Sequence, residues 1–236
     1  MTVISTKAPA KDRRLEAIIA WIRQTTDLAK GRGVLVPVSG GSDSALCLWL
    51  CAQALPRGRA LAAYVGTASH PLRCQPWFES LAQLCILPAP PDASADPEML
   101  RWASMLHHAK VNRCWLAGSR TRTEDTFGTY SLASRLATYQ PLAGTWKTEV
   151  MELCDLVGVP HEITDSSRQA DPACGRPREM ADIPFARVDL FLQVKIGQRP
   201  SSDLTGLDES QRAYLESVYQ RNQFKKQLPL RPPRDR

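Results

Sequence analysis

One stretch of this 236-residue sequence decides its fold, Val34-Leu-Val-Pro-Val-Ser-Gly-Gly-Ser-Asp-Ser-Ala-Leu-Cys-Leu-Trp-Leu50. It begins with a short apolar run, Val34 to Val38, without the polar alternation of a half-exposed strand. Such a run is typical of a strand buried on both faces of a parallel sheet. Ser44 to Leu55 is predicted to be a helix, so the residues from Ser39 onward form a strand-to-helix loop.

The same strand-then-helix pattern repeats downstream. Such alternation predicts an α/β fold with a doubly wound parallel sheet flanked by helices. Ligands in these folds bind outside the carboxyl ends of the strands, so the loops that start at Ser39 and Gly118 should face one crevice. The expected strands are 34–38, 60–65, 86–87 and 114–117, and the expected helices are one from residue 15, then 44–55, 76–84, 97–110, 148–156, 185–194 and 207–221.

Length and composition favour one soluble domain over residues 1–236, because 43% apolar residues can furnish a sizeable core. We expect a flexible arm at 1–11, a mobile loop at 164–182, rich in Asp, Ser and Pro, and a basic tail at 222–236. No apolar stretch approaches the roughly 20 residues that a membrane span needs, and no signal-like start is seen. We therefore expect a cytoplasmic enzyme without a membrane partner.

Cysteines and charge exclude some classes of function. The seven cysteines include no Cys-x-x-Cys pair, which favours buried free thiols over zinc ligands or disulfides. Most of the net charge of +6 lies near the C-terminus, and the rest of the chain is nearly neutral. A basic tail is typical of a solvated terminus, although it could also close over a phosphorylated substrate or touch RNA. Nucleic acid is therefore not the expected partner.

The loop after the first strand carries the candidate chemistry. Its backbone amides and serine hydroxyls can surround an anion at a helix N-terminus, and adjacent glycines let phosphate oxygens approach closely. An ordinary turn with a Ser or Asp helix cap is the simpler alternative. Neither the Walker pattern nor the Gly-x-Gly-x-x-Gly dinucleotide pattern is present. The candidate phosphate-binding residues are Ser39, Gly40, Gly41, Ser42, Asp43 and Ser44.

This loop resembles the Ser-Gly-Gly-x-Asp-Ser signature of the ATP pyrophosphatase superfamily. The resemblance implies that the loop holds the β- and γ-phosphates of ATP while a nucleophile attacks the α-phosphorus, giving an adenylated intermediate and pyrophosphate. It also implies an adenine nucleotide alpha hydrolase-like fold. The superfamily includes amide ligases and RNA-modifying enzymes. RNA-modifying members that make thiolated bases or deazaguanine precursors tend to use close Cys pairs, which this sequence lacks.

Later stretches resemble the ammonia-dependent NAD synthetase family, in its order. Leu116-Ala-Gly-Ser-Arg-Thr-Arg-Thr-Glu124 is similar to its Gly-Thr-x-Asn-x-Ser-Glu segment, and Pro141-Leu-Ala-Gly-Thr-Trp-Lys-Thr-Glu-Val150 to its Pro-x-x-x-x-x-Lys-Thr-x-Val segment. The resemblance implies that Ser119 and Lys147 contact ATP. It also implies that Asp43 and Glu124 bind Mg²⁺, which prefers oxygen ligands. Asp43, Glu124 and Lys147 are therefore the candidate catalytic residues.

The C-terminal third carries weaker matches, and the sequence departs there from the family pattern. Ile183-Pro-Phe-Ala-Arg-Val-Asp-Leu-Phe-Leu192 is similar to the family's Tyr-x-x-x-Asp-x-x-Leu helix, and Asn222-Gln-Phe-Lys-Lys-Gln-Leu-Pro229 to its terminal His-Lys-Arg-x-x-Pro. Candidate acid-substrate residues are Arg101, Arg135, Lys225 and Lys226. Departures are Met99 for an arginine, Leu132 to Arg135 for a segment that starts with lysine and ends with aspartate, and Phe224 for a histidine.

The resemblance implies a helical C-terminal extension and a two-step reaction. A carboxylate, such as that of deamido-NAD, attacks ATP, and ammonia then displaces AMP to leave an amide. It also implies a homodimer, with ammonia either free or supplied by a separate glutaminase. Three alternatives stay open: an amide ligase acting on a different carboxylate, an RNA-modifying adenylase that uses the basic tail, and an inactive nucleotide-sensing protein.

Overall fold

The computed structural model of the chain describes residues 12–28, 32–66, 71–89, 96–168 and 182–228. The sheet is built from strands β1 (Gly33–Pro37), β2 (Ala60–Gly66), β3 (Gln83–Pro88) and β4 (Cys114–Leu116). All strand pairs are parallel, in the order β3-β2-β1-β4. Because β2 and β4 flank β1 on opposite sides, the winding direction reverses between β1 and β4. Doubly wound folds bind ligands at such a reversal.

Helices cover both faces of this sheet. One face is covered by α1 (Arg13–Leu28), α2 (Ser42–Ala54) and α3 (Gln75–Leu81), and the other by α4 (Pro97–Val111). Side chains of β1 alternate between these layers: Val34 and Val36 join the core with α2, while Leu35 packs with Met105 of α4. These three β1 residues have no exposed surface, as the absence of polar alternation predicts.

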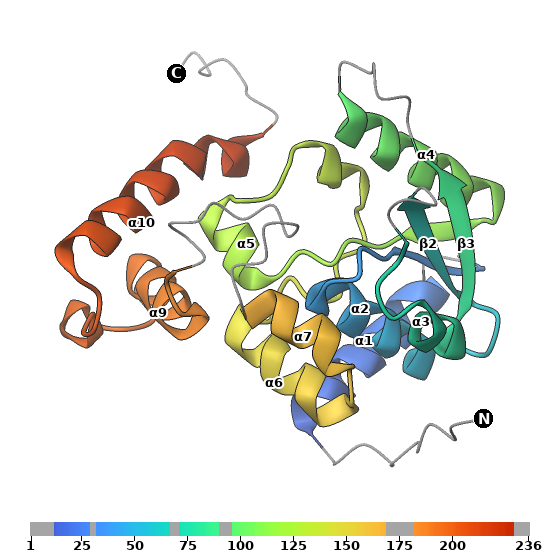
Figure 1. Cartoon of the computed structure of the whole chain (residues 1–236), viewed down its shortest axis with the longest axis horizontal. Helices are drawn as coiled ribbons and strands as arrows, with labels where there is room; N and C mark the ends of the chain where they lie inside the picture. The colour runs from blue at the N-terminus through green and yellow to red at the C-terminus, as the bar shows by residue number, and fades with distance from the viewer. Residues whose placement is uncertain (1–11, 29–31, 67–70, 90–95, 169–181, 229–236) are drawn as a thin grey trace.

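The rest of the chain adds a largely helical layer beside the sheet (Figure 1). Helices α6 and α7 pack on α2, and α9 and α10 enclose a second apolar core with Phe127 and Trp146. In Figure 1, α9 and α10 lie at one end of the molecule, with α5 and α6 between them and the sheet. The elements are α5 (Arg122–Phe127), η1 (Ala133–Leu136), α6 (Lys147–Val157), α7 (His161–Arg168), α9 (Phe185–Lys195), η3 (Ser201–Asp203), α10 (Glu209–Asn222) and η4 (Gln223–Gln227).

The predicted α/β doubly wound fold is confirmed. Several boundaries shift by one or two residues, for example α2, which begins at Ser42 and not at Ser44, and two errors are larger. Gln83 and Leu84 were expected to end a helix but begin β3, an edge strand whose alternating exposure hides the apolar signal. Residues 164–168 were expected to open a mobile loop, but they complete α7 because Ile163 and Thr164 are buried. The rest of that loop, except Asp182, lies outside the described residues, as does the arm at 1–11.

The expectations about cysteines and membrane spans concern residues that the structure largely describes. The six cysteines there are all free thiols, as predicted, but only three are buried and the other three are half-buried; Cys174 lies outside this part of the chain. Within the same residues, no helix has the length and apolar character of a membrane span. The single-domain assignment stays a prediction.

Candidate active site

The Ser39–Ser44 loop leaves the carboxyl end of β1 and turns tightly into α2. Gly40 has φ +78°, a conformation that glycine adopts without steric cost, and an added Cβ would lie 3.4 Å from Arg73 Cβ. Ser44 Oγ donates to the Gly41 carbonyl (3.0 Å) and accepts from the Ser39 amide (3.2 Å). The serines therefore brace the loop from within.

The start of α2 presents backbone donors at this loop. The first amides of a helix have no carbonyl partner within the helix, which makes them donors for anions. Ser42 N lies 3.5 Å from Ser167 Oγ, and the amides of Asp43 and Ser44 have no acceptor among the described residues. The loop thus has the donors that the phosphate interpretation requires.

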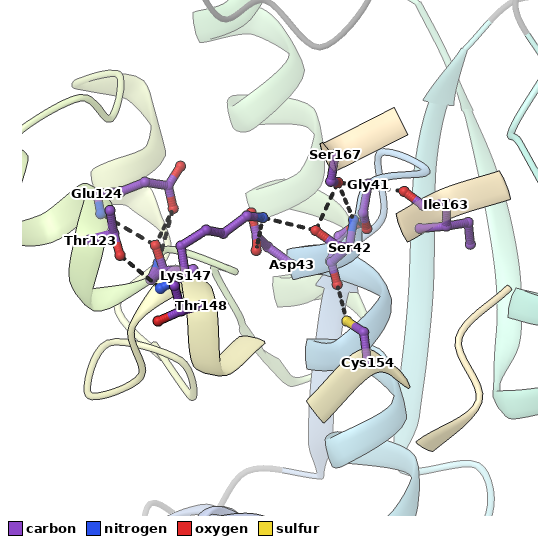
Figure 2. Close-up of polar contacts among 12 residues, drawn as sticks. Gly41, Ser42, Asp43, Thr123, Glu124, Lys147, Thr148, Cys154, Ile163 and Ser167 are labelled. Carbon is purple, nitrogen blue, oxygen red and sulfur yellow. Dashed lines mark hydrogen bonds and ion pairs between the residues drawn. The ribbon is translucent and has the colours of Figure 1, made fainter. Parts of the chain in front are cut away.

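Lys147 brings a positive charge to this loop from the first residue of α6. Its side chain extends to α2, where Nζ donates to Ser42 Oγ (2.8 Å) and pairs with Asp43 Oδ1 (2.5 Å) (Figure 2). Nζ also lies 5.4 Å from the ring centre of Phe185. The Lys147 side chain keeps only 11% of its surface exposed, so its charge is directed at the loop and not at bulk solvent.

Glu124 lies in the first turn of α5, where its side chain takes part in capping the helix. Its Oε2 accepts hydrogen bonds from Thr121 N (2.9 Å) and Thr121 Oγ1 (3.2 Å), completing a capping box with the Glu124 amide. Burial is the largest cause that raises the pKa of Glu124, and the negative charge of Asp43 raises it further. The charge of Asp43 therefore acts on the carboxyl group of Glu124.

The Gly118 loop, which Glu124 follows, lies beside α2, because β4 and β1 are parallel neighbours. The crevice predicted between the Ser39 and Gly118 loops stays a prediction. Cys47 of α2 donates its thiol to the Gly118 carbonyl at 3.9 Å. A side chain at Gly118 would collide with Gln140, whose Nε2 would lie 2.4 Å from the added Cβ. Ser119 follows directly and is half-buried. Its predicted contact with ATP stays a prediction.

Asp43 and Glu124 fit a magnesium ion by their chemistry. Mg²⁺ commonly uses one or two carboxylates together with phosphate oxygens, so a cluster of three acidic residues is not required. The described residues contain no group of three or more His, Cys, Asp or Glu that could hold a metal. Glu124 uses only Oε2 for the capping box. Burial and, after it, the charge of Asp43 raise its pKa, and a bound cation would oppose that rise.

The four predicted acid-substrate residues do not gather at the loop. Arg101 lies on α4 in an exposed ion pair with Glu98 (3.6 Å). Arg135 donates to the carbonyl of Lys225 (2.9 Å), and Lys225 Nζ donates to two carbonyls of the segment after α5. No hydrogen bond or ion pair among the described residues joins any of the four to the Ser39–Ser44 loop.

The basic tail differs from the expected solvated terminus at its beginning. Lys225 Nζ donates to Gly128 O (2.8 Å) and Tyr130 O (2.7 Å), which fastens η4 to the segment after α5. Lys226 lies over the Tyr219 ring at 5.3 Å from its centre. The expectation is therefore wrong for Lys225, whereas Lys226 is exposed, and residues 229–236 lie outside the described part.

Two buried polar residues beside the site were missed by the sequence analysis. Ser167 of α7 shares a hydrogen bond with Ser42 Oγ (2.9 Å), but it lies in a polar stretch that had been assigned to a mobile loop. Asp189 of α9 binds both Thr123 and Thr148, the neighbours of Glu124 and Lys147. Its Asp-x-x-Leu motif was noticed in the sequence, but the motif carries no signal of what the carboxylate contacts.

Comparison with known proteins places this arrangement in a family. A family model described as NAD synthase matches residues 98–229, more than half of the chain. The chain belongs to the NAD synthase family. Membership makes it an enzyme of the ligase type. The matched residues include Glu124 and Lys147, whereas the Ser39–Ser44 loop precedes them.

Relatives of the NAD synthase family align over most of this chain. An NH(3)-dependent NAD(+) synthetase of Methanosarcina mazei is 27% identical over 245 residues, covering 91% of this chain and 95% of the relative. One of Thermococcus kodakarensis is 23% identical, covering 92% of this chain and 96% of the relative. These alignments also include the Ser39–Ser44 loop region, which the family model does not reach.

Solved structures of other synthetases share the fold. NMN synthetase from Francisella tularensis superposes with a TM-score of 0.77 at 18% identity, covering 94% of this chain and 98% of the other. An NH3-dependent NAD synthetase from Campylobacter jejuni has a TM-score of 0.71 at 16% identity, covering 95% of this chain and 100% of the other. At such identities the likeness concerns the fold alone.

Proposed function

We propose that this chain is an ATP-dependent, adenylate-forming amide ligase that converts deamido-NAD, ATP and ammonia to NAD, AMP and pyrophosphate. One observation carries the proposal: Lys147 reaches the start of α2 and binds both Ser42 and Asp43. A cation beside an amide-lined loop is the arrangement that phosphoryl transfer needs, because charge builds on the phosphate oxygens in the transition state. The comparisons support the family, and the acid substrate is our inference.

In this proposal the backbone of Ser39 to Ser44 and the Ser119 side chain bind the triphosphate. Lys147 stabilises charge on the α-phosphoryl oxygens and on the departing pyrophosphate. Its ammonium can serve this purpose because it already lies next to the loop and is held away from bulk water. Because little of this side chain faces water, its contacts are stronger than they would be in bulk solvent.

Asp43 and Glu124 would hold the Mg²⁺ that accompanies ATP in this proposal. When bound, the ion neutralises phosphate charge and fixes the orientation of the triphosphate. Glu124 is already oriented by its capping box, so little ordering is needed on binding. Burial is the main cause that raises the pKa of Glu124, and the charge of Asp43 adds to it; this effect of one carboxylate on the other supports the assignment.

The reaction itself needs no side-chain nucleophile. A carboxylate oxygen of the acid forms a bond to the α-phosphorus while the bond to pyrophosphate breaks. Ammonia then attacks the acyl carbon and AMP leaves, with the excess proton released to water. The residues of the site act by positioning and by charge stabilisation. Free ammonia, or ammonia from a separate glutaminase, would supply the nitrogen, and a homodimer in the cytoplasm remains our expectation.

A second candidate, an amide ligase acting on a different carboxylate, is favoured by the acid-binding positions. Met99 and Leu132 are exposed apolar residues where the family pattern has an arginine and a lysine. Arg135 and Lys225 hold each other and the segment after α5. The structural neighbour named NMN synthetase makes the mononucleotide acid a natural alternative substrate to test.

Product analysis separates these candidates. The protein is incubated with ATP, Mg²⁺, ammonium and deamido-NAD, and AMP, ADP and NAD are quantified. We expect AMP and NAD in equal amounts, and no AMP without the acid. Absence of AMP would overturn the deamido-NAD assignment. AMP with nicotinic acid mononucleotide, or with another carboxylate from a panel, would then support the second candidate.

A further inference from the structure

Helix α6 begins with Lys147 but has no capping side chain at its first position. The first amides of a helix need acceptors from outside its own ladder. Lys147 N donates to Thr123 Oγ1 of α5 (2.8 Å), and Thr148 N donates to Asp189 Oδ2 of α9 (2.8 Å). Trp146 N donates to Glu149 within the same turn. The cap of α6 is thus supplied largely by two other helices.

Asp189 is the centre of this arrangement. Its Oδ1 accepts from Thr123 Oγ1 (2.5 Å), and its Oδ2 accepts from both the amide and the hydroxyl of Thr148 (2.8 Å each). Because the Thr123 hydroxyl proton goes to Asp189, its lone pair is available to the Lys147 amide. One carboxylate therefore sets the donor direction of the whole chain of hydrogen bonds.

Burying the Asp189 carboxylate costs desolvation free energy that an apolar side chain of similar size would not cost. Asp189 is 2% exposed and forms no ion pair among the described residues. Burial is the largest cause that raises its pKa, and the bonds from Thr123 and Thr148 oppose that rise. An apolar side chain would fill this place without the desolvation cost, but it could not accept three hydrogen bonds. The carboxylate is therefore suited to orienting its partners.

Those partners adjoin the two groups on which the proposed chemistry depends. Thr123 precedes Glu124 in the first turn of α5, and Thr148 follows Lys147 at the start of α6. Phe185, on the same helix as Asp189, lies beside the Lys147 ammonium. Helix α9 thus lies beside the ammonium of this lysine and reaches its backbone end through Thr123 and Thr148.

We propose that Asp189 is a positioning residue that fixes Lys147 and Glu124 relative to each other, through Thr123 and the first turn of α6. The inference rests on the proposed function, because it assigns these two groups to adenylation. A misplacement on the order of 1 Å in such a site can cost about 100-fold in rate. Loss of the Asp189 cap should therefore lower kcat by about 10- to 100-fold in a protein that still folds.

Two independent changes test this assignment. Asp189→Asn places an N–H where an acceptor is needed, and Thr123→Val removes the hydroxyl while keeping the shape of the side chain. Thr123→Ser keeps the hydroxyl and should recover most of the rate. Glu216→Gln is the control, because it breaks an exposed ion pair between α10 and Lys195 of α9 without touching α6.

The measurements are kcat and KM for ATP in AMP formation, well below the melting temperature of each variant. We expect kcat to fall in Asp189→Asn and Thr123→Val with a smaller change in KM, and Glu216→Gln to match the wild type. A merely structural role would reduce the amount of folded enzyme and leave the kcat of that fraction unchanged. Wild-type kcat in folded Asp189→Asn would overturn the inference.

Hydrogen exchange provides a readout that does not depend on the reaction. The amides of Lys147 and Thr148 should be protected in the wild-type protein and should exchange faster in Asp189→Asn, while the later amides of α6 stay protected. Unchanged protection would also overturn the inference. If the wild type forms no AMP, the proposed function fails, and amide protection together with Mg²⁺-dependent ATP affinity decides the role of Asp189.

Discussion

Replacing Lys147 by methionine removes one charge while keeping much of the apolar stem. The ammonium donates to Ser42 Oγ and pairs with Asp43, and 11% of the side chain is exposed. Methionine has a similar length, so the packing of the first turn of α6 should change little. The backbone amide of residue 147 keeps its bond to Thr123.

The size of the effect follows from the place of this charge. Removing one preorganised donor from a developing oxyanion typically costs about 10²- to 10³-fold in kcat, or roughly 2.7–4 kcal/mol. Lys147 also lowers the pKa of Glu124, so its loss should raise that pKa further. We therefore expect kcat for AMP formation to fall at least about 100-fold, with a smaller change in KM for ATP.

Single-turnover AMP formation is the appropriate assay, because it isolates chemistry from product release. Lys195→Met is the matched control, since Lys195 also pairs with a carboxylate but lies at the far end of α9. It should keep the wild-type rate. A Lys147→Met protein that is folded and forms AMP within about threefold of the wild-type rate would refute the assignment of this lysine to phosphoryl transfer.

Three further outcomes follow from the described contacts. The pKa of Glu124 in the folded state is raised above 4.5, so the folded state binds the carboxyl proton more tightly than the unfolded state does. The free energy of unfolding therefore decreases as pH rises from 4.5 through the folded-state pKa. Glu124→Gln should therefore raise Tm at neutral pH but not at acid pH, while abolishing AMP formation; a lowered neutral Tm would contradict this. Wild-type kcat should decline on the acid side at a higher pH than an ordinary glutamate would impose, and the pH–rate profile measures this. Gly128→Ala, at φ +77° with its new Cβ 2.7 Å from Asn222, should lower Tm more than Gly158→Ala, which has a similar φ and open space; equal Tm losses would show that the Asn222 contact yields.

Local patterns were enough to predict the architecture of this chain. Val34 to Val38 is buried as its composition indicates, and the strand order brings the Ser39 and Gly118 loops together. Strand β3 was the hardest strand to predict from sequence, because an edge strand with half-exposed residues has a weak apolar signal. Periodicity reports burial, so it identifies central strands better than edge strands.

The site was predicted less completely, because its contacts join distant parts of the chain. Lys147 was chosen through a family resemblance, and nothing local indicates that it reaches Asp43. Ser167 was assigned to a loop, and Asp189 was noticed only as part of a family motif that carries no signal of its contacts. Hydrogen bonds of this kind depend on the packing of α6, α7 and α9, which sequence spacing does not determine.

The most direct test of the central claim, that this site adenylates a carboxylate, is an oxygen-transfer measurement. Deamido-NAD labelled with ¹⁸O in its carboxylate is incubated with the protein, ATP, Mg²⁺ and ammonium, and the products are analysed by mass spectrometry. Attack on the α-phosphorus transfers one carboxylate oxygen to the phosphate of AMP, so we predict one ¹⁸O in AMP and none in pyrophosphate. Unlabelled AMP, or ADP and labelled phosphate in its place, would contradict the account.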